Sequence, residues 1–189
     1  GIGFGTAPRL GLSGEATGRV RPVKSWKPIE QATMAYGHGI TVSLAQLARA
    51  YTVFARDGDL VALSIVKSDV KPDLPIEAAS SQRVIAPNTA REVRKMLEAA
   101  VSGKGGTGAR AQVSGYRVAG KTGTAHKIVN GAYVPEKVIG SFVGFAPVSN
   151  PRIVLAVMID DPRVEKRTGG VVAAPVFAEV MAAALQILR

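Results

Sequence analysis

The sequence contains no cysteine and only two histidines, and both shortages exclude classes of site. Without cysteine the chain forms no disulfide and no thiolate metal site, and a cytosolic or a periplasmic protein can equally have this composition. His38 and His126 are too few and too far apart to predict a metal cluster. The longest clean apolar run, Ile153–Ile159, is far shorter than the roughly 18 residues that a membrane span needs. We therefore expect no metal, no cofactor and no membrane-spanning segment within this sequence.

The sequence also lacks any concentration of charge of one sign. Its net charge is +10, but no block of five or more like charges occurs, and aromatic residues make up only 5% of the chain. Nucleic-acid-binding proteins usually gather their basic residues on one face, often with aromatic side chains between them. We therefore expect no nucleic acid as a partner. A solvated basic surface and attraction to an anionic membrane or polymer both remain open.

A length of 189 residues and a hydrophobic share of 47% predict one globular domain, or most of one, with a core of its own. The sequence opens on Gly1-Ile-Gly-Phe-Gly5 and shows no basic region leading into an apolar stretch, as a signal peptide would. We therefore expect the chain to begin inside a longer protein.

The first half of the chain predicts helices joined by irregular segments. Residues 1–28 are rich in Gly, Pro and Arg with little periodicity, which indicates an irregular connection. Leu60–Lys67 alternates in polarity and contains β-branched residues, which favours a strand. Apolar spacing and capping patterns predict three helices. They are a short helix over 29–36, a helix capped by Thr41 or Ser43 and running to about Arg56, and a helix beginning at a capping box over Thr89–Glu92.

The second half predicts strands and then a closing helix. Residues 116–127 and 138–146 are β-like and flank an Asn130-Gly131 turn, and Asn-Gly between such segments is a strong hairpin signal. Arg152–Asp160 is expected to be the next strand, and a helix is expected to begin near Pro175. This order predicts an α+β fold in which an antiparallel sheet is flanked by helices.

Each of the three longer predicted helices carries apolar residues at helical spacing, so one face of each should be buried. A glycine-rich loop over Ser102–Gly108 is expected after the second of them. The residues expected on the buried faces are Leu44, Leu47, Ala48, Tyr51 and Phe54; Val93, Met96, Leu97, Ala100 and Val101; and Val176, Phe177, Val180, Met181, Leu185 and Leu188.

The most informative motif is Lys121-Thr122-Gly123-Thr124, because it puts a cation, two hydroxyls and a bare backbone on one predicted strand. Alternation along a strand places Lys121 and Gly123 on one face, and Thr122 and Thr124 on the other. Gly123 lacks a β-carbon, so a ligand or a neighbouring backbone can come close. A cation beside hydroxyl donors suits a carboxylate, and an exposed strand edge can pair with an extended peptide.

Gly115–Thr122 also satisfies the phosphate-loop pattern G-x-x-x-x-G-K-[ST]. Asp160-Asp161 after an apolar strand even resembles the acidic residues that hold magnesium in such proteins. However, a phosphate loop needs an apolar strand before its first glycine and a helix beginning at the Lys-Thr. Tyr116–Ala119 favours a strand instead, and Gly123-Thr124 is poor helix sequence. We therefore treat nucleotide hydrolysis as a minor alternative, and expect Asp160-Asp161 to end a strand.

Lys-Thr-Gly is an element of penicillin-binding and serine β-lactamase sites, which also need a Ser-x-x-Lys nucleophile and a Ser-x-Asn element. Two pairs fit Ser-x-x-Lys, Ser64 with Lys67 and Ser68 with Lys71. The chemistry requires both residues on one helical face, whereas residues three apart in a strand face opposite ways. Lys71 also precedes Pro72, which disfavours helical geometry. Because no Ser-x-Asn triplet occurs either, we expect no nucleophilic serine in this chain.

Longer segments along nearly the whole chain carry a family resemblance. They are Gly11–Glu15, Trp26–Thr33, Tyr36–Gly39, Leu44–Tyr51, Gly105–Gly108, Gly120–Ala125, Gly144–Pro147 and Gly169–Phe177. Together they resemble class B penicillin-binding proteins, the peptidoglycan D,D-transpeptidases, and most closely the septal, division-specific member of Gram-negative bacteria. His38 departs from the pattern, since such proteins often carry tyrosine there.

The resemblance implies a transpeptidase fold, with residues 1–189 as the C-terminal portion of a single transpeptidase domain. In the family a serine attacks the penultimate D-alanine carbonyl of a peptidoglycan stem peptide, releases D-alanine and passes the acyl group to the amine of another strand. β-Lactam antibiotics mimic that peptide and acylate the serine. The resemblance places the Ser-x-x-Lys and Ser-x-Asn elements upstream of Gly1, and the membrane anchor further upstream. It therefore implies a protein on the periplasmic face of the inner membrane, with cell-division proteins as partners.

The resemblance also implies roles for the motif, on an edge strand of the active-site cleft. Lys121 would supply positive potential as a catalytic residue, and Thr122 and Thr124 would contact the carboxylate of substrate or drug, beside Gly123. The backbone N–H of Thr124 would be one oxyanion-hole donor, and the serine would supply the second. Two alternatives on the same fold stay open at this point, a noncatalytic β-lactam-sensing module and a serine β-lactamase. If the protein is a transpeptidase, this chain alone is expected to be inactive.

Overall fold

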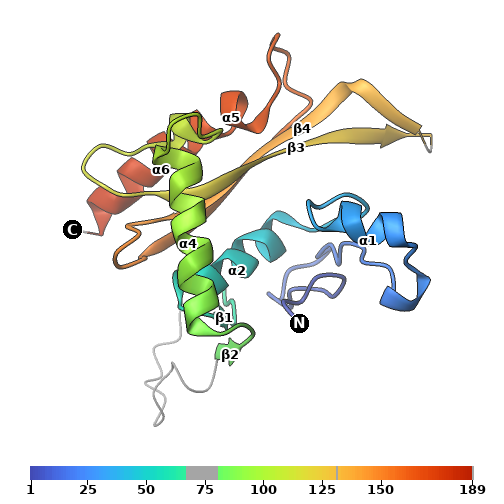
Figure 1. Ribbon diagram of the computed structural model, residues 1–189, viewed down its shortest axis with the longest axis horizontal. Coiled ribbons are helices and arrows are strands. Elements are labelled where there is room, and N and C mark those ends of the chain that lie inside the picture. Colours follow the sequence, from blue (N-terminus) through green and yellow to red (C-terminus); the bar gives the residue numbers. More distant parts are fainter. Residues whose placement is uncertain (67–80, 131, 189) are drawn as a thin grey trace.

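The structure is a computed structural model that describes residues 1–66, 81–130 and 132–188. Its centre is a three-stranded antiparallel sheet in the order β3-β4-β5 (Figure 1). The strands are β3 (Ala119–Val129), β4 (Ala132–Ala146) and β5 (Ile153–Asp160). Because β4 lies in the middle, β3 is an edge strand of this sheet.

Helices cover both faces of the sheet. α2 (Leu44–Ala55) and α4 (Pro87–Ser102) pack on one face. The short α5 (Gly169–Val172) and α6 (Ala174–Ile187) pack on the other. The α+β class with an antiparallel sheet flanked by helices, predicted from the order of elements, is confirmed.

The remaining elements are short and lie outside these layers. They are the 3₁₀ turns η1 (Val23–Ser25) and η2 (Ala109–Ala111), the helix α1 (Pro28–Met34), and the strands β1 (Asp59–Val61) and β2 (Ser81–Arg83), which pair with each other. α1 lies below the far end of the β3–β4 hairpin (Figure 1). Residues before α1 are mostly irregular, as expected from their composition.

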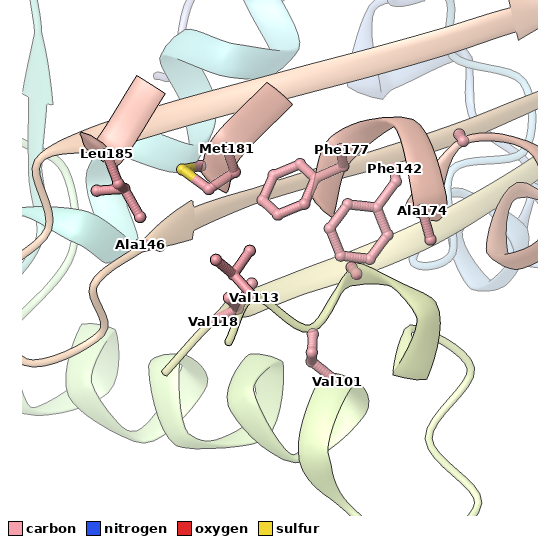
Figure 2. Packing of buried hydrophobic residues seen from close by; sticks show 11 residues of the cluster. Val101, Val113, Val118, Phe142, Ala146, Ala174, Phe177, Met181 and Leu185 are labelled. Carbon is pink, nitrogen blue, oxygen red and sulfur yellow. The ribbon is translucent and has the colours of Figure 1, made fainter. Parts of the chain in front are cut away.

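Alternate residues of β4 fill two separate cores, which explains why this strand is almost continuously apolar toward its end. Phe142 lies on the α6 side, where its ring meets that of Phe177 edge-on at a centroid distance of 4.6 Å (Figure 2). Phe145 points to the other face and packs with Leu97 of α4 and Ala55 of α2. A strand buried on both faces reads as a hydrophobic run rather than as an alternating one.

The helix predictions are confirmed in position, with one error at a boundary. Ser43 caps α2, and its hydroxyl accepts a hydrogen bond from the Gln46 N–H. The capping box predicted at Thr89–Glu92 is wrong, because α4 begins earlier, with Pro87 in its first turn and no side-chain cap. Proline has its backbone angle already set for a first helical turn and no N–H to satisfy there, so it starts the helix by itself.

The strand predictions are confirmed for the sheet but wrong in extent. The hairpin is longer than expected, since β3 continues to Val129 and β4 begins at Ala132, with a register shift between His126 and Lys127. The strand predicted over residues 60–67 is only β1 within the described residues, and Lys67 lies outside them.

The predicted buried faces are partly wrong. α6 buries Ala174, Phe177, Met181 and Leu185, whereas Val176, Val180 and Leu188 remain exposed. In α4, Leu97 and Val101 are buried, but the Met96 side chain is 66% exposed. Leu44 is also exposed at the start of α2, which buries Gln46, Ala50 and Val53 instead.

Gln46 is a polar residue on the buried face of α2. Its amide nitrogen donates to the carbonyls of Thr6 at 2.7 Å and Thr17 at 2.8 Å, and its amide oxygen accepts from the Ser43 N–H at 2.8 Å. The irregular N-terminal residues therefore lie against α2, where the Gln46 side chain binds their backbone in addition to the backbone pair of Arg19 and Thr41. Apolar spacing alone does not reveal such a contact.

Candidate active-site strand

The Lys121-Thr124 motif lies in the middle of the edge strand β3. Thr122 stands opposite Phe142 and Thr124 opposite Gly140, so both threonines face the α5–α6 side of the sheet. Lys121 stands opposite Val143, so its β-carbon points to the α2–α4 side, and the position of Gly123 faces the same side. The predicted alternation of the four residues is therefore confirmed at the level of the backbone.

The ammonium group of Lys121 nevertheless lies beside Thr122. Lys121 Nζ donates to Thr122 Oγ1 at 3.2 Å and to the Thr122 carbonyl at 3.3 Å. A long side chain can reach around the open edge of a strand, which it could not do in the middle of a sheet. The alternation rule fixes the β-carbons of this motif but not the position of its charge.

Thr122 is half-buried and has a second partner that sequence reasoning missed. The oxygen of its hydroxyl lies 3.0 Å from Thr107 Oγ1, in the glycine-rich loop that follows α4. This loop was predicted, but nothing in its composition indicated that it touches the motif. The three polar groups of Lys121, Thr122 and Thr107 thus form one hydrogen-bonded chain.

Thr124 is exposed and is tied to the start of α5. Its hydroxyl oxygen accepts a hydrogen bond from the Gly169 N–H at 3.1 Å. A β-carbon on Gly169 would lie 2.2 Å from the Ser141 carbonyl oxygen and 2.3 Å from that of Gly123, so only glycine fits against the sheet here. The glycine pair of the Gly169–Phe177 segment therefore brings α5 into contact with the motif.

Gly123 itself packs closely against the neighbouring strand. A β-carbon at this position would lie 2.5 Å from Ser141 Oγ, on the paired strand β4. Three residues earlier, a β-carbon on Gly120 would lie 2.6 Å from the ring of Phe142. The bare backbone predicted for close approach is therefore filled, in this structure, by side chains of β4.

Lys121 and Lys127 lie on the same strand, but their ammonium groups have different partners. Lys127 Nζ lies 2.8 Å from Asp160 Oδ1, and this hydrogen bond, with the nearby negative charge, raises the pKa of Lys127. Within the described residues no carboxylate forms an ion pair with Lys121, whose contacts are neutral oxygen atoms. The exposed Lys121 ammonium is therefore available to a ligand carboxylate.

An open groove of about 500 Å³ begins at Thr124 and continues along the far part of the hairpin. Its walls come from β3, β4 and the segment before α5. The lining residues are Thr124, His126, Pro135, Glu136, Val138, Glu165, Arg167 and Thr168. The groove therefore carries charges of both signs next to the last residue of the motif.

The end of the hairpin also contacts the segment that follows α1. Tyr133 Oη lies 3.2 Å from His38 Nε2, and the two rings are 5.4 Å apart between their centroids. His38 is the residue at which the sequence departs from the family pattern, where tyrosine is common. The substituted residue therefore forms a polar contact with the hairpin rather than leaving a gap.

The phosphate-loop reading does not fit the geometry. β3 runs as a strand through Lys121 and Thr122, so no helix begins at these residues to bind a phosphate. Asp160 ends β5 and pairs with Lys127, as a strand end rather than a magnesium ligand set. In the parts of the chain that the structure describes, no group of three or more His, Cys, Asp or Glu residues could hold a metal ion.

The two Ser-x-x-Lys pairs are only partly visible. Ser64 follows β1 in an irregular segment and exchanges hydrogen bonds with the backbone of Val66, at 2.8 and 3.1 Å. Lys67, Ser68 and Lys71 lie outside the described residues, so the expectation that neither pair is catalytic stays a prediction. Among residues 1–66, 81–130 and 132–188, no helix has both the length and the apolarity to cross a bilayer.

Comparison with known proteins decides the family. The model of the penicillin-binding protein transpeptidase domain matches residues 1–182. The chain belongs to this family. A protein from Neisseria flavescens named probable peptidoglycan D,D-transpeptidase PenA is 47% identical over 187 residues, which cover 99% of this chain and 45% of that protein. Membership in class B of the penicillin-binding proteins, indicated by the sequence segments, is thereby confirmed.

Solved structures of penicillin-binding proteins share the fold of this chain. The transpeptidase domain of penicillin-binding protein 3 from Burkholderia pseudomallei is 50% identical, with a TM-score of 0.90, and the match covers all of this chain and 55% of that one. Penicillin-binding protein 3 from Mycobacterium tuberculosis, complexed with aztreonam, is 34% identical with a TM-score of 0.86, and the match covers 99% of this chain and 44% of that one. The chain thus spans about half the length, or less, of these relatives.

Proposed function

We propose that residues 1–189 are the C-terminal portion of the transpeptidase domain of a septal peptidoglycan D,D-transpeptidase. The observation that carries the proposal is the Lys121 ammonium, which lies beside the Thr122 hydroxyl on an exposed strand edge and is paired with no described carboxylate. Charge-assisted hydrogen bonds to carboxylates are among the strongest polar interactions in proteins. This edge therefore suits the terminal carboxylate of a stem peptide.

The motif residues take separate roles in this proposal. Lys121 supplies positive potential, and the hydroxyls of Thr122 and Thr124 donate to the carboxylate. Thr124 Oγ1 already accepts from the Gly169 N–H, so its own proton is left to point at a ligand. Gly123 keeps the strand close to β4, so that an extended peptide can lie along the free edge of β3.

Acyl transfer would use a serine that this chain does not contain. That serine attacks the penultimate D-alanine carbonyl of the stem peptide, and the terminal D-alanine leaves. A second stem peptide then attacks the acyl-enzyme with its amine, which closes the cross-link and frees the serine. The backbone N–H of Thr124 stabilises the oxyanion in both steps, and losing one such donor costs a hydrolase about 100- to 1000-fold in rate.

The relatives support this assignment at two points. PenA of N. flavescens carries the name of a peptidoglycan D,D-transpeptidase, and the M. tuberculosis protein is a complex with the β-lactam aztreonam. By similarity, the protein acts on peptidoglycan stem peptides, is inhibited by β-lactam antibiotics and lies on the periplasmic side of the inner membrane. The septal role, the cell-division partners and an N-terminal anchor outside this chain belong to the same proposal.

A labelling experiment tests the proposal. The isolated chain and the longer protein that the proposal implies, hereafter the complete protein, are incubated with a fluorescent penicillin and separated on a denaturing gel. We expect a covalent band for the complete protein only. Release of D-alanine from a stem-peptide substrate then separates a transpeptidase from a β-lactam sensor. A covalent band for the isolated chain would show that the nucleophile lies within these 189 residues.

A further inference from the structure

We propose that Thr107 is a positioning residue that sets the direction of the Thr122 hydroxyl. The inference rests on the proposed function, because it assigns to Thr122 the task of donating a hydrogen bond to a ligand carboxylate. The observation is the 3.0 Å separation between Thr107 Oγ1 and Thr122 Oγ1, combined with the 3.2 Å contact from Lys121 Nζ to the same Thr122 oxygen.

The loop that carries Thr107 is held against the end of α4. The Gly108 N–H donates to the Ala100 carbonyl at 2.9 Å, and a β-carbon on Gly106 would lie 2.5 Å from the same carbonyl oxygen. A β-carbon on Gly108 would lie 3.0 Å from the ring of Phe142. Phe142 stands opposite Thr122 across the β3–β4 pair. The glycines on both sides of Thr107 therefore let the loop lie close to the motif.

The start of α5 packs against the other side of the loop. A β-carbon on Gly170 would lie 2.4 Å from the Thr107 carbonyl oxygen and 3.5 Å from Thr122 Cγ2. Gly169, the preceding residue, donates its N–H to Thr124 Oγ1. The loop, β3 and α5 thus meet around Thr107, and the main chain there has little room to move.

The number of hydrogen bonds that a hydroxyl can donate and accept limits where the Thr122 proton can point. A threonine hydroxyl has one proton and two acceptor positions, and an ammonium group can only donate. Lys121 therefore occupies one acceptor position of Thr122 Oγ1. If Thr107 donates into the second, the proton of Thr122 is the one capacity left, and it must point to a further acceptor.

A carboxylate is that acceptor, because an ionised carboxylate only accepts hydrogen bonds. With Thr107 donating to it, Thr122 faces the ligand as a hydrogen-bond donor. Without the Thr107 hydroxyl, Thr122 can turn its proton away and present a lone pair to the negative charge. Thr107 thus contributes to carboxylate binding without touching the ligand.

The test measures acylation of the complete protein by a fluorescent penicillin, as a second-order rate constant. Thr107→Val removes the hydroxyl and keeps the shape of the side chain, and we expect acylation to slow by about 10-fold, the size of one net hydrogen bond. Thr107→Ser keeps the hydroxyl and should restore most of the rate. Thr89→Val, at an exposed position in the first turn of α4, is the matched control and should not change the rate.

A double-mutant cycle with Thr122→Val separates positioning from a general effect on the fold. If Thr107 acts only through Thr122, the double variant should be no slower than Thr122→Val alone. Additive losses, a Thr107→Val rate equal to that of the unchanged protein, or a Thr107→Ser rate as low as that of Thr107→Val would each overturn the inference. If the unchanged complete protein is not acylated at all, the proposed function fails instead.

Discussion

Among single residues, Lys121 is distinguished by what its ammonium contacts rather than by its exposure alone. The Lys127 ammonium is paired with Asp160, whereas that of Lys121 rests against the hydroxyl and carbonyl oxygens of Thr122. An ammonium group that is not paired with a carboxylate of the protein can bind the carboxylate of a ligand. This difference makes Lys121, and not its neighbour along the strand, the expected source of positive potential.

Lys121→Ala should slow acylation of the complete protein by a fluorescent penicillin on the order of 100-fold, because it removes the charge that meets the carboxylate. The midpoint of thermal unfolding should change little, since the side chain is exposed. Lys104→Ala, an equal loss of charge in the exposed loop after α4, is the control and should react normally. Equal rates for Lys121→Ala and the unchanged protein would remove Lys121 from the site.

Tyr51 predicts a change of stability at alkaline pH. Burial disfavours its phenolate and raises the pKa of Tyr51 to about 12, above the roughly 10 of an unfolded chain. Its contribution is therefore complete below about pH 10 and is lost as the pH rises toward 12, on the order of 2 kcal/mol in the free energy of unfolding. Denaturant unfolding at pH 8 and near pH 12 measures this loss, which should be smaller in Tyr51→Phe. The same loss in both proteins would contradict the assignment.

The motif residues could be predicted from the sequence, but the residues that hold them could not. Lys121, Thr122, Gly123 and Thr124 are contiguous, so one pattern on one strand reveals them all. Thr107 and Gly169 reach the motif from 15 and 45 positions away, and no local periodicity reports such contacts. Glycine-rich sequence around both residues predicts a loop or a close approach, but it does not say which segment they contact.

At the scale of elements, strand pairing was easier to predict than helix faces. Asn130-Gly131 and the flanking β-branched residues predict the hairpin, because a turn and its two strands are local. The buried face of α6 depends on where the sheet lies, so Val180 was expected to be buried but is exposed. Similarly, the buried face of α2 includes Gln46, which contacts residues far away in the sequence.

The junction of α5 with β3 predicts a sensitive glycine. Gly169→Ala would push α5 away from the carbonyl oxygens of Ser141 and Gly123 and break the hydrogen bond to Thr124. We expect the free energy of unfolding to fall by roughly 1–3 kcal/mol, as for other overpacked sites, together with slower acylation by penicillin. Denaturant unfolding and the rate of labelling measure the two effects. A variant as stable and as reactive as the unchanged protein would contradict the packing described here.

At the scale of the molecule, the layered fold follows from the order of elements, and the family from segments spread over the whole chain. The chain spans about half the length, or less, of the relatives described. Its fold alone therefore does not explain the activity of a complete protein. In the proposed function, the edge of β3 is one wall of a site completed by residues outside this chain. The net charge of +10 is spread along the chain and does not by itself identify a binding partner.

A crystal structure of the complete protein after reaction with benzylpenicillin tests this account most directly. It should show the drug joined to a serine outside residues 1–189, with its carboxylate within hydrogen-bonding distance of the Thr122 and Thr124 hydroxyls and facing Lys121. A drug bound covalently within this chain, or a carboxylate held away from β3, would contradict it.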